Sequence, residues 1–145
     1  LFLDLDNFKP LNDTHGHALG DLLLVEVARR LKACVRQMDT VARIGGDEFV
    51  LMLSELDTDA TRSLAEASTV AEKVRLSLAE PFLLHVKHKD QADLLVAHHC
   101  TASIGLTLFG PGQSDQELIL KQADIAMYQA KDAGRNRVTL YKAAG

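Results

Sequence analysis

The sequence contains no tryptophan, only two cysteines and three prolines, and aromatic residues make up 5% of its 145 positions. The two cysteines are far apart and form no CxxC pair, which excludes a disulfide-rich domain and the usual cysteine zinc sites. We therefore expect Cys34 and Cys100 to be free, buried thiols in a reducing compartment. This indicates a cytoplasmic domain, whether or not the protein that carries it is anchored in a membrane.

Long apolar runs and an excess of positive charge are also missing. The apolar run over residues 22–25 is flanked by Asp21 and Glu26, and it is far shorter than the roughly 20 residues that a bilayer span requires. Sixteen Lys and Arg against twenty Asp and Glu give a net charge of −4, so the chain offers no broad basic face to a nucleic-acid backbone. We predict that this domain contacts neither nucleic acid nor a membrane.

The remaining composition is typical of one globular domain. The chain is 47% hydrophobic and 25% charged, and its length suits a single core. It begins with Leu1 inside a strand-like run rather than with Met, so we expect it to be a piece of a longer protein.

Hydrophobic periodicity divides the chain into helices and strands. Apolar residues at three- and four-residue steps predict helices over residues 18–37 and 59–79, and a third between a capping box at residues 114–117 and Gly134. Alternating or β-branched runs predict strands over residues 1–6, 41–44, 48–53, 81–87, 94–108 and 137–141. Residues 9–17 collect turn formers and polar side chains, which predicts a long loop with a binding role.

The turns between these segments indicate the fold class. Gly45-Gly46-Asp47 separates two strand-like runs, and a Gly-Gly pair provides the positive φ angles of a tight hairpin. Hairpins within the order β α β β α β β α β favour an α+β fold with a mainly antiparallel central sheet flanked by helices.

Acidic residues gather at the ends of predicted strands. Asp4 and Asp6 end the first strand, and Asp47 and Glu48 stand at the hairpin tip, which can lie beside it in one sheet. Carboxylates brought together repel unless a cation lies between them, and oxygen ligands with room for water and phosphate suit Mg²⁺. The alternative is that these acids are merely solvated.

Basic residues surround the predicted turn at Gly134. Lys131 and Arg135 are one turn apart at the end of the third helix, followed by Asn136 and Arg137. These side chains suit phosphate oxygens if they face the carboxylates, although the helix dipole alone also favours cations there. Neither a P-loop nor a Rossmann glycine motif occurs, so a nucleotide would be held in another way.

Two other polar groups have simpler explanations. Arg36 and Asp39 are spaced for a local ion pair. His85, His88, His98 and His99 match no zinc spacing, and alternation along strands would scatter them over both faces, so we expect no metal there.

The motif Arg-Ile-Gly-Gly-Asp-Glu-Phe at residues 43–49 resembles the signature of GGDEF domains, the diguanylate cyclase family. Further blocks resemble that family in the same order, at residues 3–9, 12–17, 20–21, 101–105 and 123–137. The resemblance implies a single GGDEF domain over residues 1–145 with a palm-like sheet similar to nucleotidyl cyclases. The domain would lack the helix and turn that usually precede its first strand.

The resemblance also implies an activity. Each domain would bind one GTP, and two domains would meet as a transient homodimer to make cyclic di-GMP and pyrophosphate. Asp4, Asp47 and the main-chain carbonyl of Leu5 would hold Mg²⁺ or Mn²⁺, and Asp47 or Glu48 would help deprotonate the ribose 3′-hydroxyl. The remaining implied substrate residues are Asn12 and Asp21 for guanine, Lys9, Lys131 and Arg135 for phosphates, and Phe8 and His17 in the same site.

Arg36 and Asp39 match the family's RxxD site, where cyclic di-GMP binds as inhibitor, and Lys73 falls where a second basic contact is often supplied by Arg. Residues 101–105 and 124–131 look most like domains followed by an EAL phosphodiesterase. The alternative to an active cyclase is therefore a silent regulatory domain that binds GTP or cyclic di-GMP within a GGDEF–EAL protein.

Overall fold

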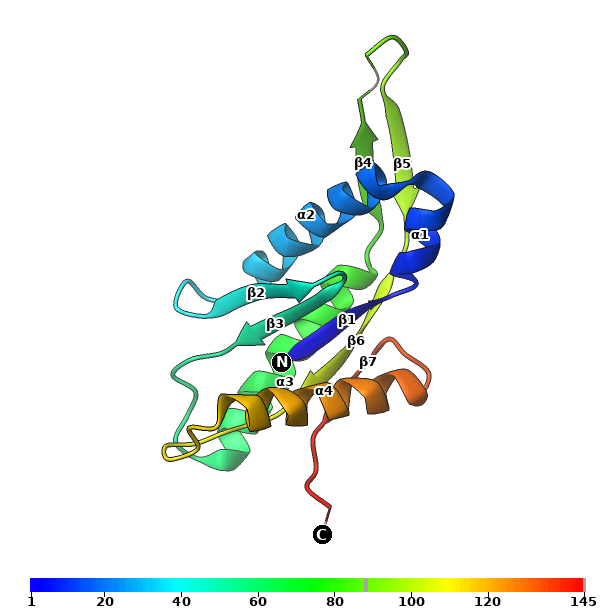
Figure 1. Ribbon diagram of the computed structural model, residues 1–145. Helices are drawn as coiled ribbons and strands as arrows, with labels where there is room; N and C mark the ends of the chain where they lie inside the picture. The colour runs from blue at the N-terminus through cyan, green and yellow to red at the C-terminus, as the bar shows by residue number, and fades with distance from the viewer. Residues whose placement is uncertain (88, 145) are drawn as a thin grey trace.

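The computed structural model describes residues 1–87 and 89–144, with the side chains of Asn12, Thr14 and His15 outside the described part. A five-stranded sheet forms the centre of the molecule, in the order β2-β3-β1-β6-β7 (Figure 1). Its strands are β1 (Phe2–Asp6), β2 (Thr40–Gly45), β3 (Glu48–Met52), β6 (Thr101–Leu106) and β7 (Arg137–Leu140). All neighbours are antiparallel except β6 and β7, which confirms the predicted α+β class and its mainly antiparallel sheet.

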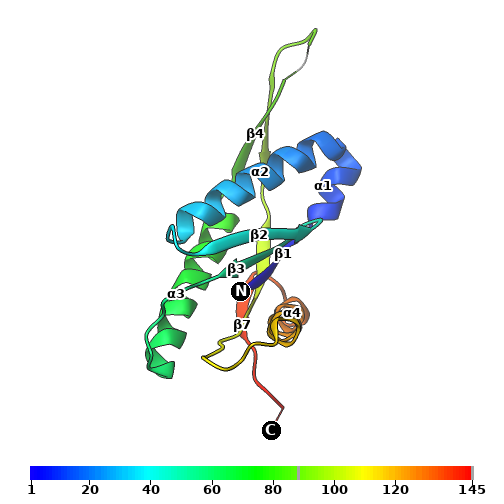
Figure 2. The same cartoon turned by 60° about the vertical axis from the view of Figure 1, so that its left-hand side comes forward.

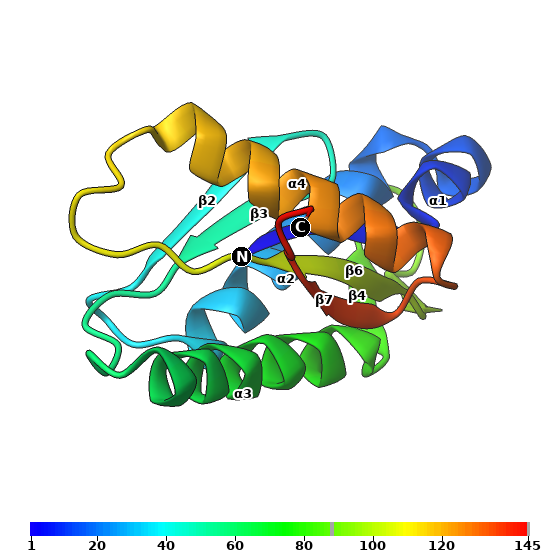
Figure 3. The same cartoon turned by 90° about the horizontal axis from the view of Figure 1, so that it is seen from below.

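Helices cover both faces of this sheet. The four helices of the described chain are α1 (Phe8–His15), α2 (His17–Cys34), α3 (Ala60–Ala79) and α4 (Gln116–Asp132). Helix α4 lies on one face, and α2 and α3 lie on the other (Figures 2 and 3). No helix among the described residues combines the length and apolarity that a membrane span requires.

The alternation of β1 decides which of its side chains face which layer. Leu3 and Leu5 are buried in the main core with apolar residues of α2 and α3. Phe2 packs instead against Ala123 and Met127 of α4. Because successive residues of a strand point to opposite faces, Asp4 and Asp6 share the α4 side with Phe2.

Helix α4 approaches the sheet closely at Gly105 of β6. A Cβ atom at this position would overlap the main chain of Ala123 and Met127. The absent side chain therefore allows the helix to seat on β6, and this contact sets the height of the whole α4 layer above the sheet.

A second, two-stranded antiparallel ribbon extends from the body of the molecule (Figures 1 and 2). It consists of β4 (Phe82–Val86) and β5 (Leu94–His98). Phe82 and Leu84 are buried at its base, and Arg30 of α2 lies 3.6 Å above the Phe82 ring. His85 and His98 fall on opposite faces of the ribbon, while His88 lies outside the described residues.

The structure corrects four expectations about the elements. Residues 8–15 form helix α1 instead of a loop, because Pro10 falls in the first helical turn, where no N–H is needed, and Leu11 is buried. The predicted strand over residues 94–108 is two strands, since the chain leaves the ribbon at His99 and joins the main sheet at Thr101.

The other two corrections concern helix ends. Helix α2 stops at Cys34 because Val35 is extended, with φ −118° and ψ 165°. Helix α4 is capped by Asp115 rather than Ser114, since the Asp115 carboxylate accepts the Leu118 N–H at 3.0 Å. Cys34 and Cys100 are free and buried, as predicted.

Candidate active site

The tip of the β2–β3 hairpin lies beside the carboxyl end of β1. Asp4 pairs in register with Glu48, and the Leu5 N–H donates to the main-chain carbonyl of Asp47 at 3.2 Å. Gly46, with φ 50°, makes the turn that presents Asp47 there. The predicted neighbourhood of hairpin and first strand is therefore present.

Asp4 is the electrostatic centre of this region. Its side chain is buried, Oδ2 accepts from Lys131 Nζ at 2.5 Å, and Oδ1 has no hydrogen-bond partner among the described residues. Burial raises the pKa of Asp4 to about 6; the hydrogen bond from Lys131 opposes this rise, and the nearby Asp47 carboxyl adds to it. Burial acts to lower the pKa of Lys131, but its bond to Asp4 outweighs burial and the pKa is raised.

These groups fit a hard divalent cation. An orphaned buried oxygen on Asp4 and a second carboxylate at Asp47 supply oxygen ligands, the type that Mg²⁺ and Mn²⁺ prefer. The N–H and C=O of one strand residue point to the same side, so the Leu5 carbonyl also faces the hairpin. Two carboxylates and one carbonyl leave positions for water and phosphate oxygens.

The four acids at the ends of the predicted strands do not all converge on one site. Within the described part of the chain, no three His, Cys, Asp or Glu side chains gather in a way that could hold a metal. Asp6 faces α4 as Asp4 does, but its carboxylate accepts from the hydroxyls of Thr101 and Ser103 and from the Asn136 N–H. These three donors were not predicted from the sequence, although the two hydroxyls alternate along β6 in the way that a shared face requires.

The basic residues implied for the phosphates lie on α4, in the turn that follows it and on α1, and Lys131 is the one in contact with a carboxylate of the site among the described residues. Lys131 occupies the last turn of α4, with its side chain directed to Asp4. Arg135 lies in the turn after α4 and not at the end of the helix itself, where it was predicted, and it is exposed with φ 64°. Lys9 is exposed on α1.

The structure describes the remaining implied substrate residues only in part. Asp21 and His17 are exposed on the first turns of α2. The side chain of Asn12 lies outside the described residues. Phe8, which the resemblance placed in the substrate site, is half-buried and packs against the main core.

Arg36 and Asp39 form a compact turn after α2. The Asp39 side chain is 2% exposed and accepts the main-chain N–H groups of Arg36 and Ser54 at 2.8 and 3.0 Å. Burial acts to raise the pKa of Asp39, but the bonds from Ser54 and Arg36 outweigh it and the pKa is lowered. The Arg36 side chain is 53% exposed, and Cys34 Sγ lies 4.0 Å from the carbonyl of Lys73 on α3. The three predicted inhibitory-site residues therefore lie near one end of α2.

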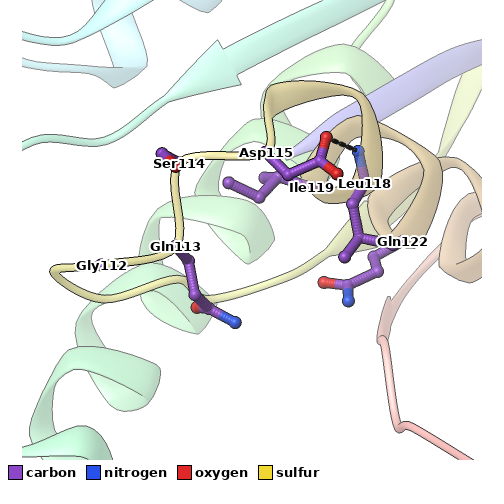
Figure 4. Close-up of a pocket in the computed structure, with 7 residues that line it drawn as sticks. All are labelled: Gly112, Gln113, Ser114, Asp115, Leu118, Ile119 and Gln122. Carbon is purple, nitrogen blue, oxygen red and sulfur yellow. Dashed lines mark hydrogen bonds between the residues drawn. The ribbon is translucent and has the colours of Figure 1, made fainter.

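A separate hollow lies at the start of α4 (Figure 4). The dashed contact there is the cap bond from the Leu118 N–H to Asp115. About 15 residues of helix, or about 22 Å, separate this end of α4 from Lys131. The hollow is therefore no part of the carboxylate site.

The chain is similar to proteins of one known family. The family described as "Diguanylate cyclase, GGDEF domain" matches residues 1–137. The bifunctional diguanylate cyclase/cyclic di-GMP phosphodiesterase MucR of Pseudomonas aeruginosa is 45% identical over 145 residues, which are 99% of this chain and 19% of MucR. The chain thus spans about a fifth of the length of that relative.

Two solved structures show the same fold. The GGDEF domain of YfiN (TpbB) from Pseudomonas aeruginosa superposes with a TM-score of 0.80 at 35% identity, covering 99% of this chain and 81% of that one. The GGDEF domain of DgcB from Caulobacter crescentus, solved in complex with c-di-GMP, gives 0.76 at 31% identity, covering 97% and 75%. From its match to the family model and from its fold, the chain belongs to the GGDEF domain family of diguanylate cyclases.

Proposed function

We propose that the chain condenses two GTP molecules into cyclic di-GMP and releases pyrophosphate. The observation that carries this proposal is the pairing of the Asp4 and Asp47 carboxylates beside Lys131, with one oxygen of Asp4 buried and unpaired. A site of this kind holds a cation on one side and phosphate oxygens on the other, as nucleotidyl transfer requires.

Each residue of the site has a separate role in this proposal. Asp4, Asp47 and the Leu5 carbonyl would hold Mg²⁺ or Mn²⁺, which when bound stabilises the attacking 3′-oxygen and the leaving pyrophosphate. Lys9, Lys131 and Arg135 bind the phosphates, and Asp47 or Glu48 beside it accepts the proton of the 3′-hydroxyl. Asn12 and Asp21 select guanine, since paired hydrogen bonds reject the wrong base strongly.

Each chain supplies one half of the reaction. The structure has a single Asp4–Asp47 pair and a single basic turn in its described part, whereas cyclic di-GMP needs two guanylate units. A transient homodimer that brings two GTP-loaded domains face to face satisfies this need. Reaction in the cytoplasm is part of the proposal, because the two buried free thiols suit a reducing compartment.

Incubation with GTP and Mg²⁺, followed by chromatography of the nucleotides, tests the proposal in the protein that carries this chain. Wild type should form cyclic di-GMP, and Asp47→Ala should form none while keeping its fold. Glu117→Ala, an exposed acid near the other end of α4, is the matched control and should retain activity. Product formation by Asp47→Ala would refute the assigned role.

A second part of the proposal is inhibition by the product at Arg36, Asp39 and Lys73. Two observations support it: the Arg36 guanidinium is exposed, and α3, which carries Lys73, lies close to the end of α2. A cyclic dinucleotide has two phosphates, and cationic side chains such as Arg36 and Lys73 bind phosphate. Added cyclic di-GMP should slow wild type, and Arg36→Ala should resist it. Equal inhibition of both proteins would count against this site.

A silent regulatory domain is the second candidate. Its support is the similarity to MucR, whose name joins a cyclase with a phosphodiesterase, and the small share of that protein that the chain spans. Tight binding of GTP or cyclic di-GMP without turnover, measured by calorimetry, would favour this candidate over the cyclase.

A further inference from the structure

Asp6 is a buried carboxylate that the proposed reaction does not use. It is 2% exposed and lies two residues after Asp4 on the same face of β1. Oδ1 accepts from the Ser103 hydroxyl at 2.7 Å, and Oδ2 accepts from the Thr101 hydroxyl at 2.6 Å and from the Asn136 N–H at 3.2 Å. Because each lost bond would leave a buried charge unsatisfied, these donors fix the carboxylate in one orientation.

The turn that Asp6 reaches has an unfavourable backbone. Arg135 and Asn136 have φ angles of 64° and 46°, in the left-handed region that side chains with a Cβ disfavour. Such residues persist where their surroundings hold them. Here the Arg135 N–H donates to the Ala130 carbonyl at 3.0 Å, and Asn136 Oδ1 accepts from Arg75 Nη1 at 3.0 Å. Asn136 is thus held by Asp6 through its main chain and by Arg75 through its side chain.

This turn joins two candidate phosphate-binding residues. Lys131 lies just before it, with Nζ 2.5 Å from Asp4, and Arg135 lies within it. The direction of the Arg135 side chain follows from its own backbone conformation. Since Asp4 and Asp6 belong to one short strand, a bond from Asp6 to the turn fixes both cations relative to the Asp4 carboxylate.

We propose that Asp6 is a positioning residue for GTP: it holds the Arg135–Asn136 turn in its left-handed form, so that Arg135 and Lys131 face the phosphates beside Asp4 and Asp47. This inference rests on the proposed function, because it takes the Asp4–Asp47 pair as the GTP site. We assign Asp6 no contact with substrate or metal, since both of its oxygens already accept hydrogen bonds from Ser103, Thr101 and Asn136.

Asp6→Ala and Asp6→Asn, made in the protein that carries this chain, test the inference. The alanine variant should raise KM for GTP about tenfold and change kcat less than about threefold, because it disturbs binding rather than the reacting groups. The asparagine variant should stay within about threefold of wild type in both constants. Its amide oxygen can accept from Thr101 and Asn136 while its NH₂ donates to the Ser103 hydroxyl.

Two further measurements separate positioning from stability. Asp59→Ala removes another carboxylate that accepts a main-chain N–H, at the remote start of α3, and should leave KM unchanged. Hydrogen exchange at the Asn136 N–H should accelerate in Asp6→Ala and stay slow in Asp6→Asn. If Asp6→Ala does not fold, Arg75→Met loosens the same turn from its other side and should raise KM about threefold.

The outcomes distinguish this inference from the function on which it rests. A wild type that neither binds nor converts GTP overturns the proposed function and the inference with it. If wild type is active, three results would overturn the inference while leaving the proposed function intact. These are an unchanged KM in Asp6→Ala, a KM in Asp6→Asn as high as in Asp6→Ala, or an unchanged hydrogen-exchange rate at the Asn136 N–H. If wild type binds GTP without turnover, its dissociation constant replaces KM in the same comparison.

Discussion

The ammonium group of Lys131 lies 2.5 Å from Oδ2 of Asp4, although 127 positions separate the two residues. Helix α4 brings Lys131 to the end of β1, where burial raises the pKa of Asp4. The lysine therefore neutralises a carboxylate that would otherwise be buried with an uncompensated charge. In the proposed function, this same lysine would bind phosphate oxygens of GTP.

Replacement of this lysine should weaken GTP binding. We expect Lys131→Met to raise the dissociation constant of GTP with Mg²⁺ by about 10- to 100-fold, because a charge-assisted bond contributes about 1.5–3 kcal/mol. Calorimetry measures the change. Lys121→Met is the control, since Lys121 is exposed on the same helix, and equal affinities for the two variants would contradict the assignment.

A methyl group at Gly105 should separate α4 from the sheet. Gly105→Ala places its Cβ against the main chain of Ala123 and Met127, which cannot yield as a flexible side chain can. We expect a loss of about 3 kcal/mol in the free energy of unfolding, measured by urea denaturation. Gly110→Ala, where a Cβ meets open space, should cost far less. Similar losses in both variants would show that α4 does not seat on β6 as described.

Arg30 should stabilise the junction between α3 and the β4–β5 ribbon. Its guanidinium donates to the carbonyls of Ser77, Glu80 and Pro81 at 2.6–2.8 Å and lies over the Phe82 ring. We expect Arg30→Met to lower the free energy of unfolding by about 2 kcal/mol. Arg29→Met, which loses only a surface pair with Glu26, should leave the melting temperature unchanged. A thermal melt of both variants gives the comparison, and equal temperatures would refute the role of Arg30.

Cys100 should make stability fall at high pH. Burial raises the pKa of its thiol from 9.0 to about 11, so between these values the unfolded chain loses a proton that the native chain keeps. Unfolding therefore becomes easier as pH rises through this interval. The advantage of wild type over Cys100→Ala should shrink by about 1–2 kcal/mol between pH 8.5 and about 10.5, measured by denaturation. The native thiol should also resist alkylation at pH 8, and rapid labelling there would contradict its burial.

Local patterns in the sequence determined most of the secondary structure, the family and several candidate site residues of this protein. The Gly45-Gly46 pair indicated the hairpin, and regular apolar steps indicated α2, α3 and α4, because turn formation and helix amphipathicity depend on neighbouring residues. The order of the motifs indicated the family. Asp4, Asp47 and Lys131 were among the predicted site residues, and the structure brings them together.

Tertiary structure decided what depends on distant partners. Asp4 and Asp6 look equivalent in the sequence, but β6 and the turn after α4 supply donors to Asp6, whereas Asp4 meets Asp47 and Lys131. Likewise, the turn formers of residues 9–17 gave no sign of α1, and the strand-like pattern over residues 94–108 gave no sign that the chain changes sheets at His99. In each case the arrangement is stabilised by contacts between segments far apart along the chain, and local periodicity carries no information about such contacts.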